Sequence, residues 1–260
     1  MTLALVTTLR TSPVFGLFVL VTLGLFGLLG VVLVQGEVVG SHSHFREHHH
    51  RIHDLTFAFL FGTAAVGMVA QLFGPLKNVA GQIMALIPWL GLALVFPLTE
   101  FWSAHGSAFV MIATALFGAL TLNAAIFHPA GRELFRSFSV ARAHRVMLAL
   151  VAVAAAPLLA FAASNVALQR GAADDHVDLG HYGFMAAFSF AVIGVGILAS
   201  LRPDGWRLTA WVSGLLPILL GVASIVLPDV ASSLSPVWAL GAIAWGIAFV
   251  AAAEIASRRG

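Results

Sequence analysis

The chain has 260 residues, of which 60% are hydrophobic and only 9% are charged. Because a soluble domain carries about 25% charged residues, this composition excludes a water-soluble globular protein, and a formal net charge of +2 is too small to indicate nucleic-acid binding. The absence of cysteine excludes disulfides, zinc–thiolate sites and iron–sulfur clusters, and it leaves His, Asp and Glu as metal ligands. We therefore expect an all-α polytopic membrane protein.

Eight apolar runs are each long enough for a transmembrane helix, which needs about 20 mainly apolar residues. In chain order they cover residues 13–35, 52–73, 79–98, 106–127, 145–165, 182–201, 207–228 and 234–256. The first run follows a single basic residue, Arg10, and no small-residue cleavage site stands out, so it is interpreted as a retained helix rather than a signal peptide. Eight spans bring both termini to one side of the membrane.

The charges predict which side that is. With eight spans, all Lys and Arg residues except Arg46, Arg51 and Arg170 lie on the side of the termini. Cytoplasmic loops carry such an excess of basic residues, so both termini are predicted to be cytoplasmic and the protein to lie in the cytoplasmic (inner) membrane. All histidines except His128 and His144 then face the outside, and these two are expected to contact lipid headgroups.

An internal repeat divides the chain into two similar four-helix bundles. At a fixed offset of 131 residues, without gaps, the matches are His50 with His181, Phe57 with Phe188, Phe59 with Phe190, Gly74 with Gly205 and Pro97 with Pro228. Four spans return the chain to its starting side, so the two units have the same orientation and are related by an axis along the membrane normal. The predicted units are 1–128 and 145–260, joined by a basic cytoplasmic linker at 129–144.

The loop before the second span is rich in histidine. Six histidines lie in the run between residues 42 and 53, and His176 follows two aspartates in a later outer loop. Imidazole is the commonest metal ligand and suits Zn, Cu, Ni and Fe. The candidate metal ligands are His48, His49, His53 and His176. A solvated loop that binds metals nonspecifically is the alternative.

Two histidines, His50 from this run and His105, lie at the outer edge where spans begin. His50 precedes the second span and His105 the fourth, and in a four-helix bundle these helices can face each other, so the two imidazoles could bind one metal or haem iron. Glu47 lies three residues before His50, where it could orient the imidazole or act as a catalytic proton acceptor. In the second unit His181 begins the sixth span, but Pro236 occupies the position that matches His105.

These residues resemble the haem A synthase family of eight-helix membrane enzymes built from two four-helix halves. The family's Glu-x-x-His-Arg motif at helix two matches Glu47-His48-His49-His50-Arg51, its histidine at helix four matches His105, and its histidine at helix six matches His181. The chain departs from the family at helix eight, where Ser235-Pro236 replaces a histidine, and in lacking the loop cysteine pair. The resemblance implies a bound haem and the oxidation of a haem methyl group.

The predicted function is therefore that of an integral membrane haem-binding oxidoreductase with an outer-face histidine site. A protein that binds or transports Cu or Zn at its outer face is the first alternative, and a metal-dependent membrane hydrolase is the second. The expected partners are the lipid bilayer and other membrane redox proteins but no nucleic acid, and a homo-oligomer stays open.

Overall fold

The computed structural model of the chain describes residues 11–39, 50–99, 107–136 and 139–258, and within these ranges all regular secondary structure is helical. The long helices are α2 (Pro13–Val39), α3 (Arg51–Gln71), α4 (Val79–Thr99), α5 (Ser107–Ile126), α7 (Arg145–Gly171), α9 (His181–Leu201), α10 (Trp206–Val226) and α11 (Pro236–Arg258). The short ones are α6 (Glu133–Arg136), α8 (Asp175–Leu179) and two 3-10 turns, Pro75–Lys77 and Val140–Arg142.

Seven of these helices are long and apolar enough to cross a membrane, and they correspond to seven of the eight predicted spans. The remaining predicted span, 106–127, is the fourth in chain order and corresponds to α5, whose apolar stretch Val110–Ile126 is shorter than those of the other helices. The described part of the chain is therefore that of a multi-pass, all-helical protein of the membrane type. The span at 106–127 and the side of the membrane on which each terminus lies stay predictions.

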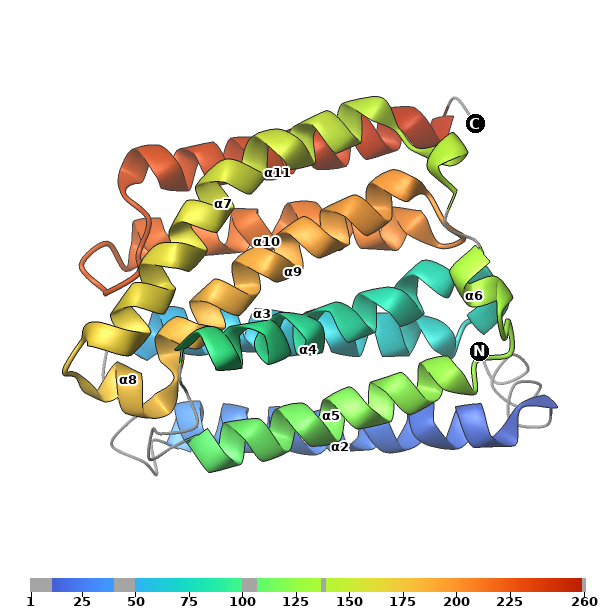
Figure 1. Cartoon of the computed structure of the whole chain (residues 1–260), viewed down its shortest axis with the longest axis horizontal. Coiled ribbons are helices and arrows are strands. Elements are labelled where there is room, and N and C mark those ends of the chain that lie inside the picture. The colour runs from blue at the N-terminus through green and yellow to red at the C-terminus, as the bar shows by residue number, and fades with distance from the viewer. Residues whose placement is uncertain (1–10, 40–49, 100–106, 137–138, 259–260) are drawn as a thin grey trace.

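The long helices form a row of four pairs (Figure 1). Helix α2 lies beside α5, α3 beside α4, α9 beside α10, and α7 beside α11. The two inner pairs join through contacts of α9 with both α3 and α4. Helix α2 begins and α11 ends at one end of the bundle, and α8 lies at the other (Figure 1). We call the end that carries α8 the His end, for the histidines described below.

Aromatic side chains fill the interior below the His end. Phe57 of α3 packs against Phe184 of α9, with ring centroids 4.6 Å apart, and this contact bridges the two inner pairs. Phe61 continues the stack toward Trp89 of α4, with centroids 5.0 Å apart. Rings with these spacings interact favourably beyond the burial of their area, so the middle of the bundle is a packed apolar core.

The end opposite the His end holds a buried polar network around His128. The Nδ1 atom of His128 accepts a hydrogen bond from the Ala130 amide at 3.1 Å, so Nε2 carries the proton and donates to Oε1 of Gln71 at 3.2 Å. The Gln71 amide in turn donates to the carbonyls of Gly67 and Asn78. Because His128 is only 3% exposed, the prediction that it contacts lipid headgroups is wrong for this residue.

This network predicts a loss of stability in acid. Burial lowers the pKa of His128 to about 4, against 6.5 in the unfolded chain. The free energy of unfolding has its full value above pH 6.5, where His128 is neutral in both states. It falls as the pH drops from 6.5 toward 4, because only the unfolded state then gains a proton. At 1.36 kcal/mol per pKa unit the loss amounts to roughly 3 kcal/mol.

Thermal unfolding in detergent at pH 7.5 and 4.5 measures this effect, with His128→Gln as the comparison, since glutamine does not titrate. The acid-induced loss of stability is expected to be smaller in the variant by roughly 2–3 kcal/mol. Equal losses in the two proteins would show that His128 is not the group responsible.

Candidate metal centre

Four histidines meet at the His end, where α3 and α9 begin. They are His50, His53, His176 and His181, and we call them the His cluster. Each is buried, with exposed fractions of 0, 0, 5 and 4% respectively. Buried ionisable residues near a membrane are rare and usually serve a function, so this cluster is the candidate site of the molecule.

A tight turn brings two of the four histidines to the same place. The carboxylate of Asp174 caps the short helix α8 by accepting a hydrogen bond from the Val177 amide at 3.3 Å. Gly180 then ends α8 and begins α9 with φ at 72°, a left-handed conformation that glycine adopts without a side-chain penalty. The sharp reversal at Gly180 lets His176 and His181, five residues apart, lie in one cluster.

Side chains from α7 and α9 hold this turn in position. Gln169 of α7 donates to the Val177 carbonyl at 2.7 Å and accepts from the Gly183 amide at 3.2 Å. Tyr182 donates its hydroxyl proton to Asp174 at 2.8 Å. Gln169 is itself buried, so its two hydrogen bonds fix α8 against the bundle.

His50 and His181 face each other directly. Their Nδ1 atoms are 3.1 Å apart, and on the far side of each ring lies a carboxylate. Nε2 of His50 is 3.1 Å from Oδ2 of Asp175, and Nε2 of His181 is 3.8 Å from Oδ1 of Asp54. The Asp175 side chain is 53% exposed and that of Asp54 is 26% exposed, so the cluster borders solvent on its acidic side.

The other two histidines complete the wall of the cluster. The rings of His50 and His176 have centroids 4.5 Å apart, and Nδ1 of His176 lies 3.5 Å from Oδ1 of Asp175. His53 stacks on His181 at 5.2 Å, with ring planes 13° apart. Nε2 of His53 is 3.4 Å from the hydroxyl of Ser232, in the loop between α10 and α11. The cluster therefore draws on helices and loops from both halves of the chain.

This geometry fits a small metal ion. Single ligand atoms from His50, His176 and His181 lie within 4.8 Å of one another. Two nitrogens bound to one zinc ion at about 2.0–2.1 Å, with a tetrahedral angle between them, stand roughly 3.3 Å apart. The 3.1 Å separation of the two Nδ1 atoms is close to that value, and His176 would have to move closer to act as a third ligand.

The structure describes four of the residues singled out from the sequence and brings all four together: His50, His53, His176 and His181. Glu47, His48, His49 and His105 lie outside the described residues. The pairing of His50 with His105 and the catalytic role of Glu47 therefore stay predictions. His181, expected to lack a partner in its own unit, has His50 of the first unit as its neighbour.

Sequence reasoning missed the polar residues that support the cluster from α7. Asn165 accepts a hydrogen bond from Ser232 at 2.6 Å, and Gln169 holds the α8 turn. Both are buried polar residues, four apart, within an otherwise apolar helix, and that pattern is itself a signal for a functional site in a membrane protein. The chemistry of the site is inferred from its own residues, because no protein-family model, curated protein or solved structure matches the chain.

Proposed function

We propose that the His cluster binds one transition-metal ion through His50, His176 and His181, and that the protein is a metal-dependent membrane hydrolase. The observation that carries the proposal is the convergence of three buried imidazoles whose ligand atoms lie within 4.8 Å of one another. Three protein ligands with one open position are typical of catalytic zinc sites. A zinc ion held in this way supplies a nucleophile at neutral pH by lowering the pKa of water.

The carboxylates support metal binding by His50 and His181. A carboxylate beside Nε2 favours the tautomer with a proton on that nitrogen, as in the carboxylate–histidine–zinc arrangement. The Nδ1 atoms of His50 and His181 share a hydrogen bond at 3.1 Å, so one of them carries the proton of that bond. With Asp175 beside His50 and Asp54 beside His181, a metal ion can take the place of that proton and accept both Nδ1 lone pairs.

The short distance between His50 and His181 favours a single metal ion over a haem bound by these two histidines. A haem held by His50 and His181 would place its porphyrin between two imidazole nitrogens that are 3.1 Å apart. The rings of the two histidines are also inclined at 75°, and His176 packs against both. An ion needs only the small space between the three rings.

The interior of the bundle favours hydrolysis over transport. Among the residues whose burial the structure describes, no Asp, Glu, Lys or Arg is buried. The buried hydroxyls of Thr56 and Thr63 donate to carbonyls one turn earlier in their own helix, at 2.7 and 2.8 Å. Phe57 and Phe184 close the core directly below the cluster. With the aromatic core directly below it, the cluster suits chemistry at the membrane surface.

The distribution of charge supports an outward-facing site. Basic residues on connections between helices at the end opposite the His end include Lys77, Arg132, Arg136, Arg142 and Arg202. Since cytoplasmic loops are enriched in such residues, the His end faces outside in this proposal, and substrates reach it from that side of the membrane.

Metal analysis of the purified full-length protein tests the proposal. After a wash with a mild chelator, we expect about one zinc ion per chain by mass spectrometry of the metal, because buried ligands exchange slowly. A His176→Ala variant that folds normally is expected to retain less than a tenth of that amount. Wild-type protein free of zinc after expression with ample zinc, or a Soret band in its visible spectrum, would contradict the proposal.

The two carboxylates are expected to tune the affinity of the site. Asp175→Asn and Asp54→Asn each replace a carboxylate that faces a histidine with a neutral amide of the same size. Loss of such an outer partner typically weakens metal affinity by about 10–100-fold. Competition with a zinc-sensitive dye measures the change. Asp229→Asn is the control, since Asp229 is an exposed carboxylate in the loop between α10 and α11 and removes the same charge. A uniform effect of all three variants would point to net charge alone.

A further inference from the structure

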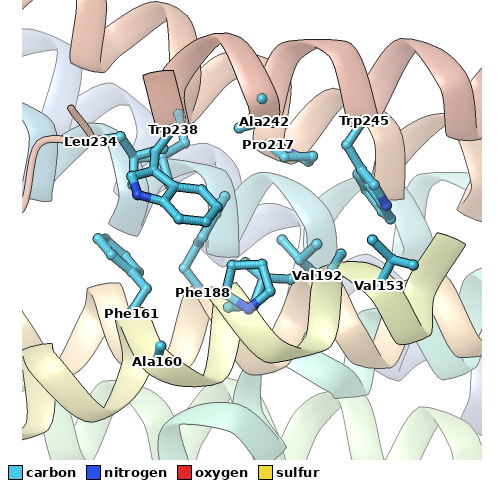
Figure 2. A pocket seen from close by; sticks show the side chains of 15 residues that line it. Val153, Ala160, Phe161, Phe188, Val192, Pro217, Leu234, Trp238, Ala242 and Trp245 are labelled. Atoms are coloured by element: carbon cyan, nitrogen blue, oxygen red, sulfur yellow. The ribbon is translucent and has the colours of Figure 1, made fainter. Parts of the chain in front are cut away.

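An apolar cavity of about 450 Å³ lies in the second unit, enclosed by α7, α9, α10 and α11 (Figure 2). Its floor is formed by residues deep in the bundle, with Phe188 fully buried and Val192 only 1% exposed. Its mouth opens on the outer surface of the bundle, where Val153 and Trp238 are 71% and 59% exposed. Every residue of the lining is apolar, so nothing in the cavity offers a charge to a ligand.

The cavity is elongated along the helices. On α11 its lining extends from Trp238 to Trp245, and on α7 from Val153 to Phe161 (Figure 2). At 1.5 Å per residue these stretches measure roughly 10–12 Å. Pro157 of α7 and Pro217 of α10, both inside helices, line it as well. A proline in a helix interior removes a backbone hydrogen bond and bends the helix, which helps to keep α7 and α11 apart at this level.

One end of the cavity shares a wall with the His cluster. The Phe161 carbonyl accepts from the Asn165 amide at 2.9 Å, and Asn165 accepts from Ser232 at 2.6 Å. Ser232 is 3.4 Å from Nε2 of His53. Leu234, two residues after Ser232, lines the cavity beside Trp238 (Figure 2). A molecule that fills the cavity therefore has one end next to the proposed metal centre.

We propose that this cavity holds one acyl chain of a membrane lipid, with the carbonyl end of the chain at the His cluster. The mouth lies between membrane-spanning helices, where the surrounding solvent is hydrocarbon. An elongated space with an apolar lining that opens to hydrocarbon matches a lipid chain better than a polar ligand. The polar network of Ser232, Asn165 and His53 at one end fixes the direction in which an amphiphile enters.

The inference rests on the proposed function, for which it names the substrate class as acyl lipid esters. In the reaction, the oxygen of water bonds to the acyl carbonyl carbon and the carbon–oxygen bond to the lipid alcohol breaks. The alcohol leaves with one proton from water, and the fatty acid carries the other or releases it. The step needs no oxidant or reductant, which agrees with a site built from imidazoles and carboxylates.

Photo-crosslinking in lipid nanodiscs tests the site. The probe is phosphatidylcholine with a diazirine near the methyl end of one acyl chain, and the labelled peptides are mapped by mass spectrometry. We expect adducts at Trp245, at the far end of the cavity from Phe161 (Figure 2), and on the floor at Val192, which surrounding lipid cannot reach because it is 1% exposed. A diazirine near the carbonyl should instead label the Phe161 and Leu234 end. The reverse pattern would overturn the direction of binding.

A filled-cavity variant and a matched control complete the test. A Cβ atom added at Gly241 meets no heavy atom within 4 Å, and Gly241 lines the cavity, so Gly241→Trp is expected to fill the cavity and to reduce floor labelling at least tenfold. Ala156→Trp, on α7 one turn before the lining residue Ala160, is exposed and outside the lining and should leave labelling unchanged. Absence of floor labelling, labelling insensitive to Gly241→Trp, or labelling by a diazirine sterol alone would overturn the proposal.

The metal content separates this inference from the proposed function. Zinc in the protein without floor labelling would overturn the lipid site and leave the metal centre standing. Floor labelling in a protein that binds no zinc would support the lipid site and overturn its assignment as a hydrolase substrate site. His176→Ala should keep the floor labelling while it loses zinc, because His176 is not part of the cavity lining.

Discussion

The His181→Ala variant is expected to lose its zinc in a mild-chelator wash, from about one ion per chain to less than a tenth. His181 supplies the nitrogen that lies 3.1 Å from Nδ1 of His50, and without it two of the three proposed ligands remain. The variant also removes a ring that stacks on His53 at 5.2 Å, so folding is checked by size-exclusion chromatography and circular dichroism before the metal is measured.

Rescue distinguishes a lost ligand from a lost fold. Free imidazole is small enough to occupy the space left by the His181 side chain, and it should restore zinc binding to His181→Ala at millimolar concentration. His144→Ala serves as the control, because His144 caps α7 at the opposite end of the bundle and its loss costs about 1 kcal/mol of stability without touching a ligand. Zinc retained by His181→Ala at the wild-type level would disprove the three-histidine ligand set.

The second large effect is expected from Gly246→Ala, where α10 and α11 touch backbone to backbone. A Cβ atom at Gly246 would meet the Gly214 carbonyl oxygen and would lie 2.7 Å from Cγ1 of Ile218. Small residues allow such close helix contacts in membranes. Forcing the two helices apart should lower the free energy of unfolding by about 1–3 kcal/mol.

Gly241→Ala on the same helix is the matched control, since an added Cβ at Gly241 meets no atom within 4 Å. Alanine should there stabilise the helix by up to about 1 kcal/mol. Thermal unfolding monitored by light scattering or intrinsic fluorescence compares the two variants in the same detergent. If both variants shift the midpoint in the same direction and by the same amount, the helix contact at Gly246 does not limit stability.

The helices could be predicted from the sequence because lipid imposes a simple rule. A spanning helix must be apolar for about 20 residues, so the predicted spans 52–73, 79–98 and 182–201 correspond closely to α3, α4 and α9. The prediction for the first span stopped at residue 35, whereas α2 continues to Val39. Helix ends depend on local hydrogen bonds rather than on hydropathy, which explains why they are harder to place.

The candidate site could be predicted only in part. Histidines at helix starts were visible in the sequence, and the 131-residue offset between His50 and His181 indicated equivalent positions. Matching positions in a repeat need not touch each other. Two such residues meet only when both lie near the axis that relates the two repeats. That depends on the packing of α3 against α9, which neither composition nor periodicity reveals. The pairing of Asp175 with His50 depends in addition on the reversal at Gly180.

The separation of His50 and His181 along the chain also sets an order of events during biosynthesis. The two residues are 131 positions apart, so a ribosome that adds about 5–20 residues per second produces the second roughly 7–26 s after the first. During that interval His50 has left the ribosome while its partner does not yet exist. In the proposed function, the ion can therefore be captured only after α9 has been made, and metal loading would report that both halves of the nascent protein have come together.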